Sequence, residues 1–147
     1  MIALGLIGIG CLPAPSPGPS PTPEEAVAFL SQAVELARAG RWEDLCAIGS
    51  ANCERALADA GKEAVPLDPP TVRRTWLVNS TGNAVGGRVL EVCGVDGRNE
   101  PYVTEILVFR LGSETRAIEP VYWSGIVIAT DPVVGDEPAV LGPCPTG

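Results

Sequence analysis

A chain of 147 residues with a formal net charge of −8 and no histidine excludes several classes of function at once. Its acidity argues against a nucleic-acid partner, because phosphate binding needs clustered basic residues and only Arg73 and Arg74 are adjacent. We interpret these two arginines as a solvated strand face. The absence of histidine removes the commonest general base, the usual catalytic triads and nearly every catalytic zinc site. We therefore expect no metal and no cofactor.

Residues 1–11 form an uncharged apolar run that ends in Cys11. Ten residues rise only about 15 Å as a helix, half of a bilayer core, so the run cannot span a membrane by itself. It matches the apolar part of a secretory signal. The sequence Gly8-Ile9-Gly10-Cys11 resembles the lipobox of bacterial lipoproteins, which implies lipidation of Cys11, export, and attachment to the outer face of the cell membrane. The alternative is a buried apolar element of the domain.

Residues 12–23 contain only Leu, Pro, Ala, Ser, Gly and Thr. Such a composition favours extended polyproline II at about 3.1 Å per residue, a semi-rigid spacer. The segment is therefore predicted to be a tether that holds the domain away from the membrane.

Three helices are predicted after the tether. Thr22, Pro23 and Glu25 form a capping-box pattern, apolar residues follow at helical spacing, and Gly40 marks the end of this long helix. A short second helix is predicted over residues 41–46 and a third over residues 53–60, which ends at Gly61.

Strands are predicted from residue 71 onward, where β-branched and aromatic residues become frequent. The predicted spans are Thr71–Val78, Val85–Val95, Tyr102–Leu111 and Thr115 to about Ala129, with a bulge or bend at Pro120. The third span is apolar on both faces, which indicates a central strand. Residues 131–147 are predicted to be an irregular tail. The whole pattern predicts an α+β fold over residues 24–130, with one long and two short helices packed on a curved, four-stranded, mainly antiparallel sheet.

Five cysteines leave one over in an exported protein, and lipidation of Cys11 would leave an even four. Cys46 and Cys53 flank the turn between two predicted helices and are expected to pair. Cys93 with Cys144 would then tie the tail to a strand. The alternatives are free buried thiols or a metal site, although the spacing of Cys46 and Cys53 is wider than that of zinc knuckles.

The segment from Gly40 to Cys46, with sequence Gly-Arg-Trp-Glu-Asp-Leu-Cys, is similar to a turn found in the nuclear transport factor 2-like superfamily. Four strands that finish in Val121-Tyr122-Trp123 add to the resemblance. It implies a cone of helices on a strongly bent sheet. Members of the superfamily include isomerases, dehydratases, oligomerising adaptors and tethered extracytoplasmic domains.

In an enzyme of that superfamily the open end of the cone holds an acid–base pair, for which the candidates are Glu105 with Tyr102 or Tyr122. Asp68 is a further candidate, with turn formation as its alternative role. Glu105 has two alternatives as well, an exposed sheet position or an ion pair with Arg74 or Arg110.

The tryptophans give a second set of candidates. Trp76 and Trp123 are expected on strands, where the concave face of the sheet would form a ligand pocket, and a role as core anchors is the alternative. Trp42 is interpreted as a core anchor.

Two functions remain open after these considerations. The first is a lipid-anchored, extracytoplasmic, non-catalytic domain that binds an apolar small ligand or a partner protein. The second is a small isomerase- or lyase-like enzyme with Glu105 as its base.

Overall fold

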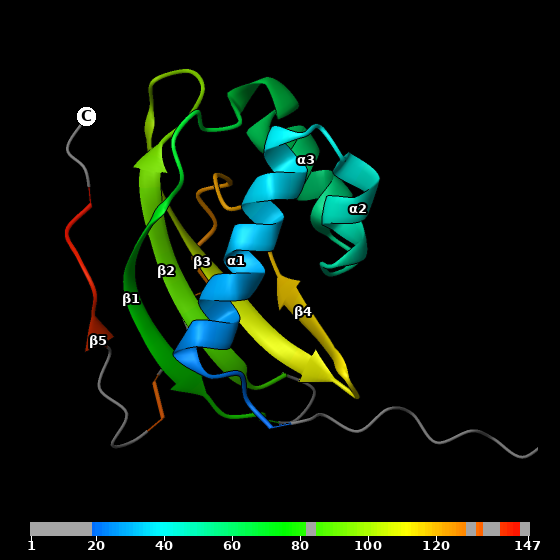
Figure 1. The fold of residues 1–147 in the computed structure, drawn as a ribbon, viewed down its shortest axis with the longest axis vertical. Helices are drawn as coiled ribbons and strands as arrows, with labels where there is room; N and C mark the ends of the chain where they lie inside the picture. The colour runs from blue at the N-terminus through cyan, green and yellow to red at the C-terminus, as the bar shows by residue number, and fades with distance from the viewer. Residues whose placement is uncertain (1–18, 82–84, 129–131, 134–138, 145–147) are drawn as a thin grey trace, which may run out of the picture.

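The computed structural model describes residues 19–81, 85–128, 132–133 and 139–144, which form an α+β domain (Figure 1). Helices come first: α1 (Pro23–Arg38), α2 (Trp42–Ala47), α3 (Cys53–Ala60) and the 3-10 turn η1 (Lys62–Ala64). The strands follow: β1 (Thr71–Val78), β2 (Gly87–Val95), β3 (Pro101–Leu111), β4 (Glu114–Ile118) and β5 (Ala139–Val140). The α+β class and the antiparallel sheet are confirmed. The predicted signal and lipobox segment, most of the tether and parts of the tail lie outside the described residues.

Helix α1 begins and ends with the signals that the sequence carries. The Thr22 hydroxyl accepts a hydrogen bond from the Glu25 backbone N–H at 3.2 Å, and the Glu25 carboxylate accepts one from the Thr22 N–H at 2.8 Å. At the other end Gly40 has a φ of 70°, which favours glycine, and the Arg41 N–H donates to the Leu36 carbonyl. Within the described residues, no helix is long and apolar enough to cross a bilayer.

The sheet has the order β4-β3-β2-β1-β5, and all neighbouring strands are antiparallel. Strand β3 lies between β2 and β4, as the two apolar faces of its sequence predict. Helix α1 crosses one face of the sheet, here called the inner face (Figure 1). Its buried side chains pack there against fully buried strand residues, which include Leu90, Val92, Ile106 and Val108.

The opposite, outer face of the sheet carries a second, smaller apolar cluster. It consists of the buried residues Trp76, Val89 and Leu107, with Ile118 and Ile128 packed against them. The central strands are therefore buried on both faces, although the helices cover only one.

The prediction of a last strand from Thr115 to about Ala129 is wrong, because β4 ends at Ile118. Glu119 has a φ of 70°, and Pro120 has no N–H to donate to a ladder. The next three residues, Val121–Trp123, turn into the core and are 0–4% exposed. The left-handed backbone at Glu119 and the missing N–H of Pro120 therefore end the strand, in spite of the β propensity of the three residues that follow.

After this turn the chain returns along β3. The Glu105 N–H donates to the Ile126 carbonyl at 2.9 Å, and the Gly125 N–H donates to the Thr104 hydroxyl at 2.9 Å. Ile128 then reaches the outer apolar cluster. Further on, the Val133 N–H donates to the Leu77 carbonyl of β1, so residues of the tail lie at the opposite edge of the sheet.

The tail was predicted to be irregular, but Ala139 and Val140 pair with Thr75 and Arg74 of β1. Two disulfides are present, Cys46–Cys53 and Cys93–Cys144, with Cα–Cα distances of 5.3 and 5.7 Å. Both expected pairings are thus confirmed. The first joins α2 to α3, and the second ties the tail to β2.

Loss of the two disulfides is expected to have unequal effects on stability. The sequence separations are 7 and 51 residues, and a longer closed loop restricts the unfolded chain more. Cys46→Ala/Cys53→Ala should lower the free energy of unfolding by about 2–3 kcal/mol, and Cys93→Ala/Cys144→Ala by about 4 kcal/mol. Urea denaturation measures both values. A larger loss for the shorter loop would contradict this expectation.

Candidate functional site

The predicted acid–base candidates lie on opposite faces of the sheet. Tyr102 faces the inner core, whereas Glu105 is an odd number of residues along the same strand and faces outward. The Glu105 carboxylate is buried, and its Oε2 accepts a hydrogen bond from the Ile128 N–H at 2.8 Å. Tyr122 also belongs to the inner core. The structure therefore does not bring Glu105 together with either tyrosine, and Asp68 is exposed on a loop.

The two tyrosines themselves are close to each other inside the core. Their ring centroids are 6.5 Å apart, and neither hydroxyl has a hydrogen-bond partner among the described residues. Burial raises the pKa of Tyr122 to about 12 and raises that of Tyr102 still further. Both hydroxyls therefore stay protonated at neutral pH.

Trp76 and Trp123, the predicted pocket candidates, are each only 4% exposed. The Trp123 Nε1 donates to the Gly61 carbonyl at 3.1 Å, and its ring meets Tyr122 edge-on at 4.9 Å between centroids. Trp76 lies in the outer apolar cluster, with the Arg74 guanidinium carbon 5.7 Å from its ring centroid. Their geometry is that of core anchors.

A partly buried ionic cluster next to Trp76 was missed from the sequence. Glu91 is 4% exposed, and its carboxylate accepts two hydrogen bonds from Arg74, at 3.0 and 2.5 Å. Arg73 lies 3.4 Å from the same carboxylate, and Glu105 is directly opposite Glu91 in the β2–β3 ladder. The arginine side chains are 44% and 37% exposed, so they lie on a solvated face, as predicted, and in addition clamp a buried acid. The sequence feature that could have indicated it is a glutamate in the middle of each of two apolar strands, Glu91 in β2 and Glu105 in β3.

Glu119 is a second buried acid that the sequence did not indicate. Its side chain is 6% exposed, and its Oε1 has no hydrogen-bond partner within the described residues. Burial raises the pKa of this carboxyl to about 7, although a hydrogen bond from the Val121 backbone lowers it in part. The left-handed backbone at this residue adds strain to the same position.

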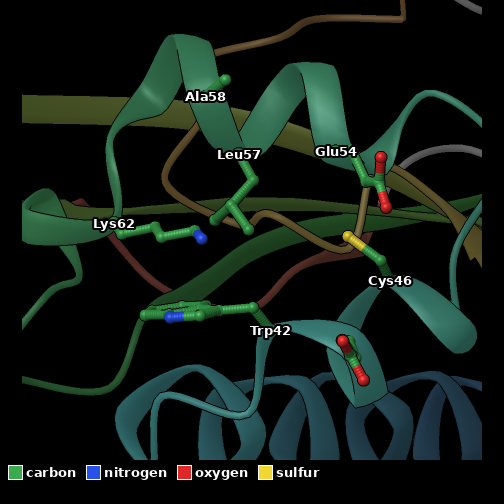
Figure 2. Close-up of a pocket in the computed structure, with 7 residues that line it drawn as sticks. Trp42, Cys46, Glu54, Leu57, Ala58 and Lys62 are labelled. Atoms are coloured by element: carbon green, nitrogen blue, oxygen red, sulfur yellow. The ribbon is translucent and has the colours of Figure 1, made fainter.

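A hollow lies at the surface between α2 and α3 (Figure 2). It has a volume of about 290 Å³. Its lining residues are Trp42, Glu43, Cys46, Glu54, Leu57, Ala58 and Lys62. Figure 2 shows the Lys62 side chain extending over the indole of Trp42, and the ammonium nitrogen is 5.8 Å from the ring centroid.

A second hollow of about 280 Å³ lies beside the first. Trp42 and Lys62 line both, and the second adds Ala37, Arg38, Gly40, Val65, Pro66 and Leu67. We call the two hollows together the Trp42 groove. Trp42 packs against the core but is only partly buried, so the core-anchor interpretation describes one part of its surface.

The side chains of the Trp42 groove are chemically mixed. Its side chains supply an indole, aliphatic groups, two carboxylates and two cations. Among the described residues, no group of three or more Asp, Glu, Cys or His side chains could hold a metal ion. The Cys46–Cys53 disulfide joins the two helices that form its first hollow, which fixes their spacing.

No protein-family model, curated protein or solved structure matches this chain.

The clamp on Glu91 predicts a specific pattern of stability changes. Arg74→Met should lower the free energy of unfolding by about 2–3 kcal/mol, because a buried carboxylate loses its fork of hydrogen bonds. The double variant Arg74→Met/Glu91→Gln should regain more than half of that loss. Arg41→Met is the control, since the Arg41–Asp44 pair is exposed, and it should cost less than about 0.5 kcal/mol. Equal losses for the single and double variants would refute the clamp.

Glu119 predicts a dependence of stability on pH. Its folded-state pKa, about 7, lies above the ordinary value of 4.5, so the folded protein keeps a proton that the unfolded chain releases. Its contribution to stability is therefore greatest at low pH and declines as the pH rises from about 4.5 through 7. In Glu119→Gln this decline should be missing. Between pH 4 and pH 8, the free energy of unfolding of the variant should therefore fall by about 3 kcal/mol less than that of the wild type. Urea midpoints across this range measure the effect.

The exposed Glu114→Gln is the control for this measurement and should keep the wild-type slope. An unchanged slope in Glu119→Gln would show that the buried carboxyl does not titrate as expected.

Proposed function

We propose that the protein is an exported, lipid-anchored, non-catalytic interaction domain that receives a partner protein in the Trp42 groove. The observation that carries the proposal is the position of Trp42. Its indole is kept partly exposed between two hollows, on helices that a disulfide holds together. A large, rigid aromatic side chain in such a setting is typical of binding hot spots.

Export is supported by the two disulfides, because such bonds persist in oxidising compartments. They use Cys46, Cys53, Cys93 and Cys144, which leaves Cys11 of the lipobox-like sequence as the fifth cysteine. Arg88 donates a hydrogen bond to the Pro21 carbonyl at 2.9 Å and so fixes the last part of the proline-rich segment on the domain. The tether would then act between Cys11 and Pro21.

A non-catalytic role is supported by the positions of the acid–base candidates. Glu105 lies on the outer face of the sheet, and the tyrosines lie in the inner core. The inner face is filled by α1 and by Val121–Trp123, which occupy the space that a ligand would need in a cone. A protein partner on the surface is therefore favoured over a small molecule inside.

We also propose that the domain belongs to the nuclear transport factor 2-like type. In support, the segment from Gly40 to Cys46 forms the turn from α1 into α2, with Gly40 in the left-handed region and Leu45 fully buried. The order of three helices followed by antiparallel strands, with α1 across the sheet, fits the same type (Figure 1).

The anchor is tested by mass spectrometry of the full chain isolated from bacterial membranes. Wild-type protein should begin at Cys11 and carry the added mass of lipid, whereas Cys11→Ser should lack that mass and leave the membrane fraction. Ser20→Ala, in the same proline-rich segment, is the control and should behave as wild type. Mature protein with an unmodified Cys11, or with Cys11 in a disulfide, would overturn the anchor.

A further inference from the structure

The indole of Trp42 already holds a cation from its own chain. The Lys62 ammonium lies 5.8 Å from the ring centroid, within the range in which the negative face of an aromatic ring attracts positive charge. Lys62 is exposed and sits at the mouth of the hollow (Figure 2). An arginine is a better partner for such a face, because its planar guanidinium can stack on the ring. The ring is thus suited to a guanidinium from outside.

Two carboxylates complete the chemistry of the first hollow. Glu43 and Glu54 line it together with Trp42, and neither has a hydrogen bond or ion pair to its carboxylate within the described ranges. Neighbouring acids differ in this respect, since Asp44 pairs with Arg41 and Glu63 pairs with Arg98. The first hollow therefore combines an aromatic face with two unpaired negative charges, which is complementary to a basic side chain.

The second hollow has a different character. Val65, Pro66 and Leu67 line it, and Leu67 is 80% exposed. Leu67 and the partly buried Val65 offer apolar surface to an aliphatic side chain, whereas Pro66 is fully buried. Because Trp42 and Lys62 line both hollows, a basic and an aliphatic side chain from one short peptide could occupy the two sites together.

We infer that the Trp42 groove recognises a peptide segment with an arginine next to an aliphatic residue. The guanidinium stacks on Trp42 and faces Glu43 and Glu54, and the aliphatic side chain covers Val65 and Leu67. This inference rests on the proposed function, for which it names the chemistry of the partner. The net charge of −8 draws a basic segment toward the domain.

Replacement of Lys62 should change the affinity in a direction that depends on the charge of the bound peptide. If an arginine takes the face of Trp42, the Lys62 ammonium competes with it and repels it. Lys62→Met should therefore tighten binding, by about threefold. If the groove instead bound an acidic segment, the same substitution would weaken binding.

Nuclear magnetic resonance of the full, nitrogen-labelled chain in detergent micelles provides the test. The indole N–H signal of Trp42 is assigned by its loss in Trp42→Phe. Three blocked dipeptides are the probes: acetyl-Leu-Arg-amide, its uncharged citrulline analogue, and acetyl-Leu-Glu-amide. We expect the arginine peptide to shift this signal in a saturable way, and to bind at least about tenfold more tightly than the citrulline peptide.

Variants then assign the contacts. Glu43→Gln and Glu54→Gln should each weaken binding of the arginine peptide by about threefold. Glu24→Gln removes a charge at the far end of α1 and should leave binding unchanged. Equal binding of the arginine and citrulline peptides, or weaker binding in Lys62→Met, would overturn the inference.

The acidic peptide distinguishes a failure of the preference for cations from a failure of the groove as a binding site. A shift of the Trp42 signal by acetyl-Leu-Glu-amide, but not by the arginine peptide, would keep the groove as a binding site and refute its preference for cations. No shift by any of the three peptides would contradict both the preference and the groove.

Discussion

Burial of the central strands on both faces is the constraint from which the rest of this structure follows. Strand β3 is apolar on both sides, and three helices can cover only one side of a sheet. The other side must be covered by the rest of the chain, because exposed apolar clusters of that size are costly in water. The turn at Glu119 and Pro120 answers this requirement, since it sends Ile128 to the outer cluster. The Cys93–Cys144 disulfide then keeps the tail near the same sheet.

Local signals in the sequence predicted the parts of the fold that depend on neighbours along the chain. Thr22 and Glu25 cap α1, Gly40 ends it, and the short spacing of Cys46 and Cys53 predicted their disulfide. The second disulfide was then expected from the two remaining cysteines. The turn at Glu119 could not be predicted in this way, because Val121-Tyr122-Trp123 has the composition of a strand and its burial depends on α1 and α3. The Arg74–Glu91 ion pair could not be predicted for a similar reason. It depends on the register between β1 and β2, which the sequence of neither strand determines by itself.

The candidate site, too, could be predicted only in part from the sequence. Glu105 was a candidate base with Tyr102 or Tyr122, but Tyr102 lies an odd number of residues away on β3 and so faces the other side of the sheet. Tyr122 lies beyond β4, in the inner core. Trp42 appeared to be an ordinary core residue, and only the packing of α2 beside α3 leaves part of its indole at the surface. The inner and outer faces of the sheet both carry buried clusters, whereas the Trp42 groove presents part of an indole, carboxylates and cations at the surface.

Photo-crosslinking in intact membranes tests whether a partner protein meets this domain at the Trp42 groove. A photoreactive residue is placed at Leu67, on the rim of the groove, and in a second variant at Val140, on the edge strand β5. Both positions are highly exposed, at 80% and 75%, so neither has an advantage in access to solvent. We expect a discrete adduct from position 67 that disappears when Trp42 is replaced by leucine, and none from position 140. An adduct from position 140 alone, or from neither position, would contradict this expectation.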